Sequence, residues 1–159
     1  QIQFETGINK NIFLHLQQKV ENMNEADRCC ALLFDEMSLT SGYHYDVNKQ
    51  LICGYEDLGH LGRSNKEANH GLVFMVRGLR RNFKQVVAYY FTSGTISAKA
   101  LKLIIVRLIS ELQSIGLKIL ARVCDQGKTN QSALQQLCAD NSINNSSYYF
   151  SVNGVRIVT

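Results

Sequence analysis

Two aspartates, each at the end of a short apolar run, are the residues of this chain best suited to chemistry. Asp35 ends the run 30–35, and Asp125 ends the run 119–125. Runs this short and this rich in aliphatic residues predict buried strands. Sites in open sheets with parallel strands lie beyond the carboxyl ends of those strands. Because residues two apart share a face of a strand, each aspartate also has an alanine four residues upstream on its own face, as expected of two matched strands.

A pair of neighbouring carboxylates would bind a divalent cation. Two carboxylates about 5 Å apart repel each other by roughly 3 kcal/mol at an effective dielectric constant near 20. Such a pair must share a proton or hold a cation, and oxygen-only ligands favour Mg2+ or Mn2+. The alternative is that each aspartate only caps the turn or helix that follows its strand, because Asp is common there. The residues alone leave both interpretations open.

The elements that position these aspartates alternate between strands and helices. Apolar residues at helical spacing predict a helix over 9–24 with Asn9 or Asn11 as its N-cap. They predict a second helix from Ala98 to Ile115, capped by Ser97 or Thr95 and ending before Gly116. The other expected elements are strands over 51–53, 72–76 and 85–91, a loop over 54–71 and a helix over 130–139 capped by Asn130. The segments 148–150 and 155–158, separated by Asn153-Gly154, predict a hairpin or a turn into a last strand.

Length and composition fit one globular domain. The chain has 159 residues, 45% of them hydrophobic, and a net charge of +4, which permits a polyanionic partner. It contains no apolar run of membrane-spanning length and no secretory signal. Five cysteines without a CxxC motif favour free thiols in a reducing compartment. Because the chain begins at Gln1 and stops at Thr159 inside an apolar run, we expect it to be a piece of a longer protein.

Two further clusters are weaker candidates for a site. The basic turn 77–84 could contact DNA phosphates, but a solvated hairpin end explains it equally well. His44, His60 and His70 lie in predicted loops near Cys53, although their spacings match no zinc-binding pattern.

Four blocks of sequence resemble the P-element-type transposases, a group that includes the THAP-domain transposases. The blocks lie at 33–38, 73–79, 84–91 and 124–130, in order and at plausible spacing. The resemblance implies an α/β ribonuclease H-like fold, with a mixed sheet of antiparallel meander plus parallel strands flanked by helices. It divides the chain into an N-terminal helix and connection (1–28) and a catalytic core (29–159) that stops before the family's third acid, a glutamate.

The resemblance also implies a function, namely part of the catalytic domain of a cut-and-paste DNA transposase. Asp35 and Asp125 would be its first two catalytic acids and metal ligands, with two Mg2+ (or Mn2+) ions in the complete site cleaving and joining strands. The implied partners of the full-length protein are double-stranded DNA of transposon ends and target, with a nuclear location, no membrane, and a homo-oligomer among the expectations. The fragment alone is expected to be inactive.

Two alternatives use the same residues differently. One is a domesticated, non-catalytic, transposase-derived module that binds DNA or protein. The other is a two-acid nuclease unrelated to transposons. Glu36, next to Asp35 in the chain, is expected to be an outer-shell or surface residue rather than a ligand, because it should point to the opposite face if the strand continues. The remaining ligand of this nuclease would come from a set of other acids, namely Asp46, Glu56, Asp57, Glu67 and Asp140.

Overall fold

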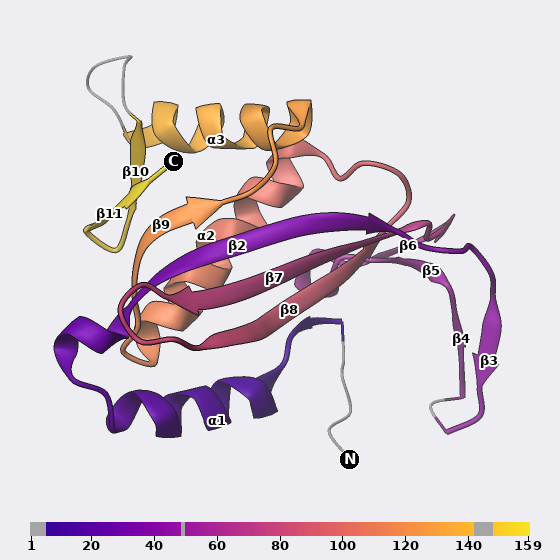
Figure 1. The fold of residues 1–159 in the computed structure, drawn as a ribbon. Helices are drawn as coiled ribbons and strands as arrows, with labels where there is room; N and C mark the ends of the chain where they lie inside the picture. Colours follow the sequence, from indigo (N-terminus) through magenta and orange to yellow (C-terminus); the bar gives the residue numbers. More distant parts are fainter. Residues whose placement is uncertain (1–5, 49, 142–147) are drawn as a thin grey trace.

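The computed structural model describes residues 6–48, 50–141 and 148–159, which form a mixed sheet with helices packed against it (Figure 1). In this described part, nine strands make the main sheet in the order β10-β11-β9-β2-β7-β8-β5-β6, with β1 paired to β8. The strands β2, β7 and β8 form an antiparallel meander, whereas β9 runs parallel to both β2 and β11. The predicted α/β architecture, including its N-terminal helix, is therefore confirmed.

The bounds of the elements are as follows. The helices are α1 (Lys10–Glu21), α2 (Ala98–Ser114) and α3 (Lys128–Asn141), with short 3-10 turns η1 (Glu25–Arg28) and η2 (Gly59–Leu61). The strands are β1 (Gly7–Ile8), β2 (Cys29–Ser38), β3 (His44–Asp46), β4 (Leu51–Cys53), β5 (Tyr55–Asp57), β6 (Arg63–Glu67), β7 (His70–Gly78), β8 (Lys84–Thr92), β9 (Lys118–Val123), β10 (Tyr149–Val152) and β11 (Val155–Val158). None of the described helices is long and apolar enough to cross a membrane.

The residues that cap α1 and α2 are those that the sequence predicts. The Asn9 side chain accepts hydrogen bonds from two backbone N–H groups in the first turn of α1, at 3.0 and 3.2 Å. Ser97 caps α2 in the same way, through the backbone N–H of Ala100. Gly116 follows the end of α2 with a φ of +94°, a conformation that costs glycine little.

One face of the sheet carries the hydrophobic core. Alternate residues of the meander are fully or almost fully buried, and they join the apolar stripes of α1 and α2 in one core cluster. In Figure 1, α2 crosses behind β2, β7 and β8. Residues on the opposite face, among them Leu33, Val73 and Met75, are only partly buried, and Val123 is 54% exposed. The side of the sheet that carries Asp35 is thus left partly open.

Two predictions of element bounds are wrong. The strand that carries Asp35 does not end there, because β2 continues to Ser38 in unbroken antiparallel pairing with β7. The segment 54–71 is not one loop, because it contains β5 and β6. β5 pairs with β8 through Asp57 and Phe91, so backbone pairing at the sheet edge overrides the polar local sequence. A separate two-stranded ribbon, β3 with β4, extends away from the main sheet (Figure 1).

Candidate active site

Asp35 lies inside β2, on the open side of the sheet. It pairs with Val73 of β7, and its side chain is exposed. The backbone N–H of Glu36 donates a 2.9 Å hydrogen bond to Asp35 Oδ1. Asp35 Oδ2 accepts no hydrogen bond from any described residue, so one oxygen of this carboxylate is available to a ligand.

Asp125 follows the end of β9, in the short connection to α3. Its Oδ1 accepts a hydrogen bond from the Gly127 backbone N–H at 3.2 Å and another from the side-chain amide of Asn130. The carboxylate therefore joins the end of β9 to the first turn of α3. This is the capping role that was the alternative to metal binding. Only Oδ1 serves this role, because Oδ2 has no hydrogen-bond donor among the described residues.

Asn130 and Gly127 have roles that the sequence did not predict. Asn130 does not cap α3, because it lies inside the first turn and turns its amide toward Asp125. A side chain on Gly127 would bring a Cβ to 3.3 Å from Asp125 Oδ1. No periodicity reveals these contacts, since both depend on how the connection folds back.

Parallel pairing of β2 with β9 brings the two aspartates together. Leu33 is in register with Val123, and each aspartate lies two residues beyond its member of that pair. Because residues two apart share a face of a strand, the Asp35 side chain lies on the side of Leu33, and Asp125 lies just beyond the end of the neighbouring strand. Asp35 and Asp125 both line one mainly apolar hollow of about 360 Å3. Neighbouring strands are about 4.8 Å apart, so side chains at matched positions can hold one ion between them.

The thiol of Cys124 lies beside this pair but is a poor ligand. Burial raises its pKa, and the negative charges of Asp125 and Asp35 raise it further, against the opposing effect of Arg122. Arg122 Nη1 donates to Cys124 Sγ at 2.7 Å, and the thiol donates to the Asp125 backbone carbonyl at 3.0 Å. The sulfur is therefore protonated and already engaged near neutral pH.

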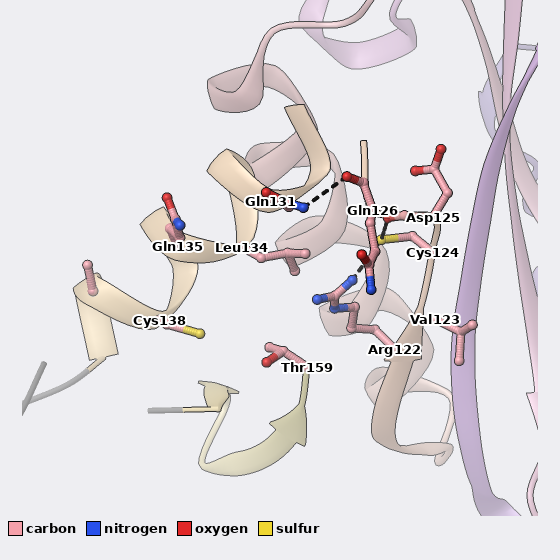
Figure 2. Close-up of a pocket in the computed structure, with 11 residues that line it drawn as sticks. Arg122, Val123, Cys124, Asp125, Gln126, Gln131, Leu134, Gln135, Cys138 and Thr159 are labelled. Atoms are coloured by element: carbon pink, nitrogen blue, oxygen red, sulfur yellow. Dashed lines mark hydrogen bonds between the residues drawn. The ribbon is translucent and has the colours of Figure 1, made fainter. Parts of the chain in front are cut away.

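A larger hollow, of about 650 Å3, lies between β9 and α3 (Figure 2). Arg122, Cys138 and Thr159 are among the residues that line it. Figure 2 shows the Asp125 carboxylate at the rim, directed away from Cys138 and Thr159. This hollow is larger than the one that both aspartates line, but it contains only one of them, so the smaller hollow is the better candidate.

Glu36 points to the face opposite Asp35, as predicted from strand alternation. It is half-buried, and Thr92 Oγ1 donates a 3.0 Å hydrogen bond to its Oε1. It lines a third hollow, of about 240 Å3, together with Asp125 and Asn130. Glu36 is therefore close to the site but engaged with the buried hydroxyl of Thr92.

The other metal-site candidates are not brought together. Within residues 6–48, 50–141 and 148–159, no three His, Cys, Asp or Glu side chains form a group suited to a metal ion. Among these residues, His44, His60 and His70 therefore do not form a zinc site, and no third acid joins Asp35 and Asp125. Among the alternative acids, Glu56 accepts hydrogen bonds from Ser64 and Ser93, and Asp57 is paired with Arg63 at 2.7 Å, while the side chain of Asp140 lies outside the described residues.

Comparisons with known proteins agree with the sequence resemblance. A family model described as the TNP-like, RNase H N-terminal domain matches residues 4–138. The chain is 30% identical over 126 residues to the DNA transposase THAP9 of Homo sapiens, a match that covers 75% of this chain and 13% of that protein. It is 26% identical over 117 residues to the transposable element P transposase of Drosophila melanogaster, covering 74% of this chain and 13% of that protein.

A solved structure shares the fold. The Drosophila P element transposase strand transfer complex superposes with a TM-score of 0.74 at 22% sequence identity, over 99% of this chain and 31% of the matched chain. The predicted ribonuclease H-like fold is thereby confirmed. The chain spans only 13% of the length of the curated relatives that it matches.

Proposed function

Because this chain belongs to the TNP-like RNase H N-terminal domain family, we propose that it forms part of the catalytic domain of a cut-and-paste DNA transposase. In this proposal Asp35 and Asp125 are two of the acids that hold the divalent metal ions. The reaction is cleavage of DNA strands and their transfer to target DNA. The full-length protein would carry it out, and the isolated chain would be inactive.

One observation carries the proposal, namely the common hollow of Asp35 and Asp125. Asp35 lies on β2, Asp125 directly follows the neighbouring parallel strand β9, and both residues line this hollow. Each accepts hydrogen bonds at Oδ1 from residues close to it in the chain, and Oδ2 has no donor among the described residues. Two aspartates that only capped turns would have no reason to meet at one place.

The donor set fits Mg2+ or Mn2+. These ions prefer carboxylate oxygens. The thiol of Cys124, which lines the same hollow, is already engaged in hydrogen bonds, and its pKa is raised by burial. Two such ions, when bound, activate the attacking oxygen and stabilise the leaving oxygen at a phosphodiester. The Asn130 amide and the Gly127 N–H orient Asp125, and the Glu36 N–H orients Asp35, so neither carboxylate has to be reorganised when metal binds.

The remaining parts of the proposal concern the longer protein. A third oxygen ligand would come from residues other than the described ones, as would the recognition of transposon ends. Double-stranded DNA is the proposed substrate, the nucleus the proposed location, and a homo-oligomer the proposed assembly. The two relatives are named as transposases, and the strand transfer complex is one of the P element enzyme, which supports DNA as the substrate.

Calorimetric titration with Mn2+ tests the metal site. The parent chain should bind Mn2+ weakly, and Asp35→Asn and Asp125→Asn should each reduce the affinity by at least about tenfold, because each removes one charged ligand. Glu21→Gln, which neutralises an exposed carboxylate of α1, is the matched control and should bind Mn2+ like the parent.

Equal Mn2+ affinity in the parent and both aspartate variants would remove the metal-site assignment. The domesticated module would then be the better description, because its fold does not need the acids. Metal-dependent nicking of DNA by the isolated chain would contradict the proposal differently, by showing that two acids suffice.

A further inference from the structure

The end of the sheet opposite the two acids is strongly basic. Four exposed cations gather there around Asn82 and Phe83 at the β7–β8 turn, and we name this surface the basic end; its cations are Lys19, Arg77, Arg81 and Lys84. We propose that the basic end binds the phosphate backbone of double-stranded DNA, an inference that rests on the proposed function.

Two adjoining hollows give the basic end its shape. Lys19 and Arg81 line a hollow of about 690 Å3 between α1 and the turn. Arg77 and Lys84 line the other, of about 450 Å3. Asn82 and Phe83 are common to both, so the two hollows adjoin at the β7–β8 turn. No Asp or Glu is found among the described residues that line either hollow.

The cations of the basic end form no salt bridge with any acid of the described residues. Arg77 and Lys84 lie directly opposite each other on β7 and β8, an arrangement in which like charges repel. Neither of them, nor Lys19 or Arg81, forms an ion pair with another described residue. Arg80, in the same turn, differs because its Nε lies 3.7 Å from Asp27 Oδ1. An external anion would relieve this repulsion.

The basic end and the acids are aligned along the sheet. Arg77 pairs with Ala31 and Val73 pairs with Asp35, so all four lie on one face, in register without a break. Four strand residues separate Arg77 from Val73, a distance of roughly 13 Å at about 3.3 Å per residue. This equals about four base-pair steps of a duplex, so DNA whose scissile bond lay at the acids could reach these cations with its backbone.

Phosphate contacts should reveal themselves in the salt dependence of DNA binding. Each contact adds about 0.9 to the slope of log K against log salt concentration, so four contacts predict a slope of about −3.6. Fluorescence anisotropy with a duplex of about 20 base pairs, in EDTA and at about 50 to 200 mM salt, measures this slope. Over that range the affinity of the parent should fall by roughly 150-fold.

Variants of the basic end should lower this slope in steps. Arg77→Gln with Lys84→Gln should reduce its magnitude by about 1.8, and adding Lys19→Gln and Arg81→Gln should nearly abolish it. Lys66→Gln with Lys99→Gln removes the same charge as the double variant from exposed positions elsewhere and should leave the slope unchanged. All the substituted side chains are exposed, so the thermal unfolding temperatures should remain within about 2 °C of the parent.

The same proteins distinguish this inference from the metal site. Variants of the basic end should keep the Mn2+ affinity of the parent, and Asp35→Asn should keep its DNA affinity in EDTA. Equal slopes for the parent and the quadruple variant, or equal loss in the Lys66/Lys99 control, would overturn the inference and leave the metal site standing. Binding to vesicles of anionic lipid without binding to DNA would overturn it as well.

Discussion

Replacing Asp125 by Asn and by Ala separates the two roles of this side chain. Its Oδ1 accepts from the Gly127 N–H at 3.2 Å and from the Asn130 amide, which joins β9 to α3. Asn keeps an oxygen acceptor in the place of Oδ1 but removes the negative charge. Ala removes the acceptor and the charge. The first variant therefore perturbs metal binding alone, and the second perturbs metal binding and the connection.

The expected magnitudes differ accordingly. Loss of a side-chain acceptor at the start of a helix costs about 0.5–2 kcal/mol of unfolding free energy. We expect Asp125→Ala in EDTA to unfold roughly 1–8 °C below the parent, since 1 kcal/mol corresponds to about 2–4 °C for a domain of this size. Asp125→Asn should stay within about 0.5 kcal/mol of the parent. Mn2+ at ten times the parent's Kd should add about 1.4 kcal/mol to the parent and at most about 0.4 kcal/mol to either variant.

Urea denaturation in EDTA and in excess Mn2+ measures both effects, with Glu21→Gln as the control that should behave like the parent in each buffer. Equal destabilisation by Asn and Ala in EDTA would refute the role of the Oδ1 hydrogen bonds. Stabilisation of both variants by Mn2+ to the same extent as the parent would refute the metal role. Each result tests one role, because the two buffers isolate them.

Three more predictions follow from contacts and burial. Gly127→Ala should weaken Mn2+ binding severalfold in calorimetry and change stability by less than about 1 kcal/mol, because its Cβ would press on Asp125 Oδ1 at 3.3 Å; unchanged affinity would contradict this. Leu108→Ala should cost about 2–5 kcal/mol in urea denaturation because Leu108 is fully buried, whereas Leu103→Ala, at a position 45% exposed on the same helix, should cost less than about 0.5 kcal/mol. Tyr90→Phe should not reduce stability at pH 7, because the Tyr90 hydroxyl is buried without a hydrogen-bond partner among the described residues. Burial raises the pKa of this phenol from 10.0 to about 12, so the phenol ionises in the unfolded chain at a lower pH than in the folded one. The parent therefore keeps its stability below pH 10 and loses stability as pH rises from 10 toward 12, and the Phe variant should lose less over that interval in pH-dependent unfolding.

Local sequence determined the elements whose residues depend mainly on their neighbours. The apolar stripe from Ala98, the cap at Ser97 and the glycine at 116 predict α2 almost to the residue. Asn153 and Gly154, with φ values of 50° and 78°, form the turn between β10 and β11 that an Asn-Gly pair predicts. These features needed no knowledge of the rest of the chain, because capping, turn conformation and helical periodicity are short-range effects.

The site itself required the tertiary structure. Sequence predicted Asp35 and Asp125 as candidates, but only the parallel pairing of β2 with β9 brings them to one hollow. The continuation of β2 past Asp35 and the strands within 54–71 were likewise decided by distant partners. The physical reason is that backbone hydrogen bonds between strands are made by every residue type, so polar segments can pair at a sheet edge without any periodic signal in their own residues.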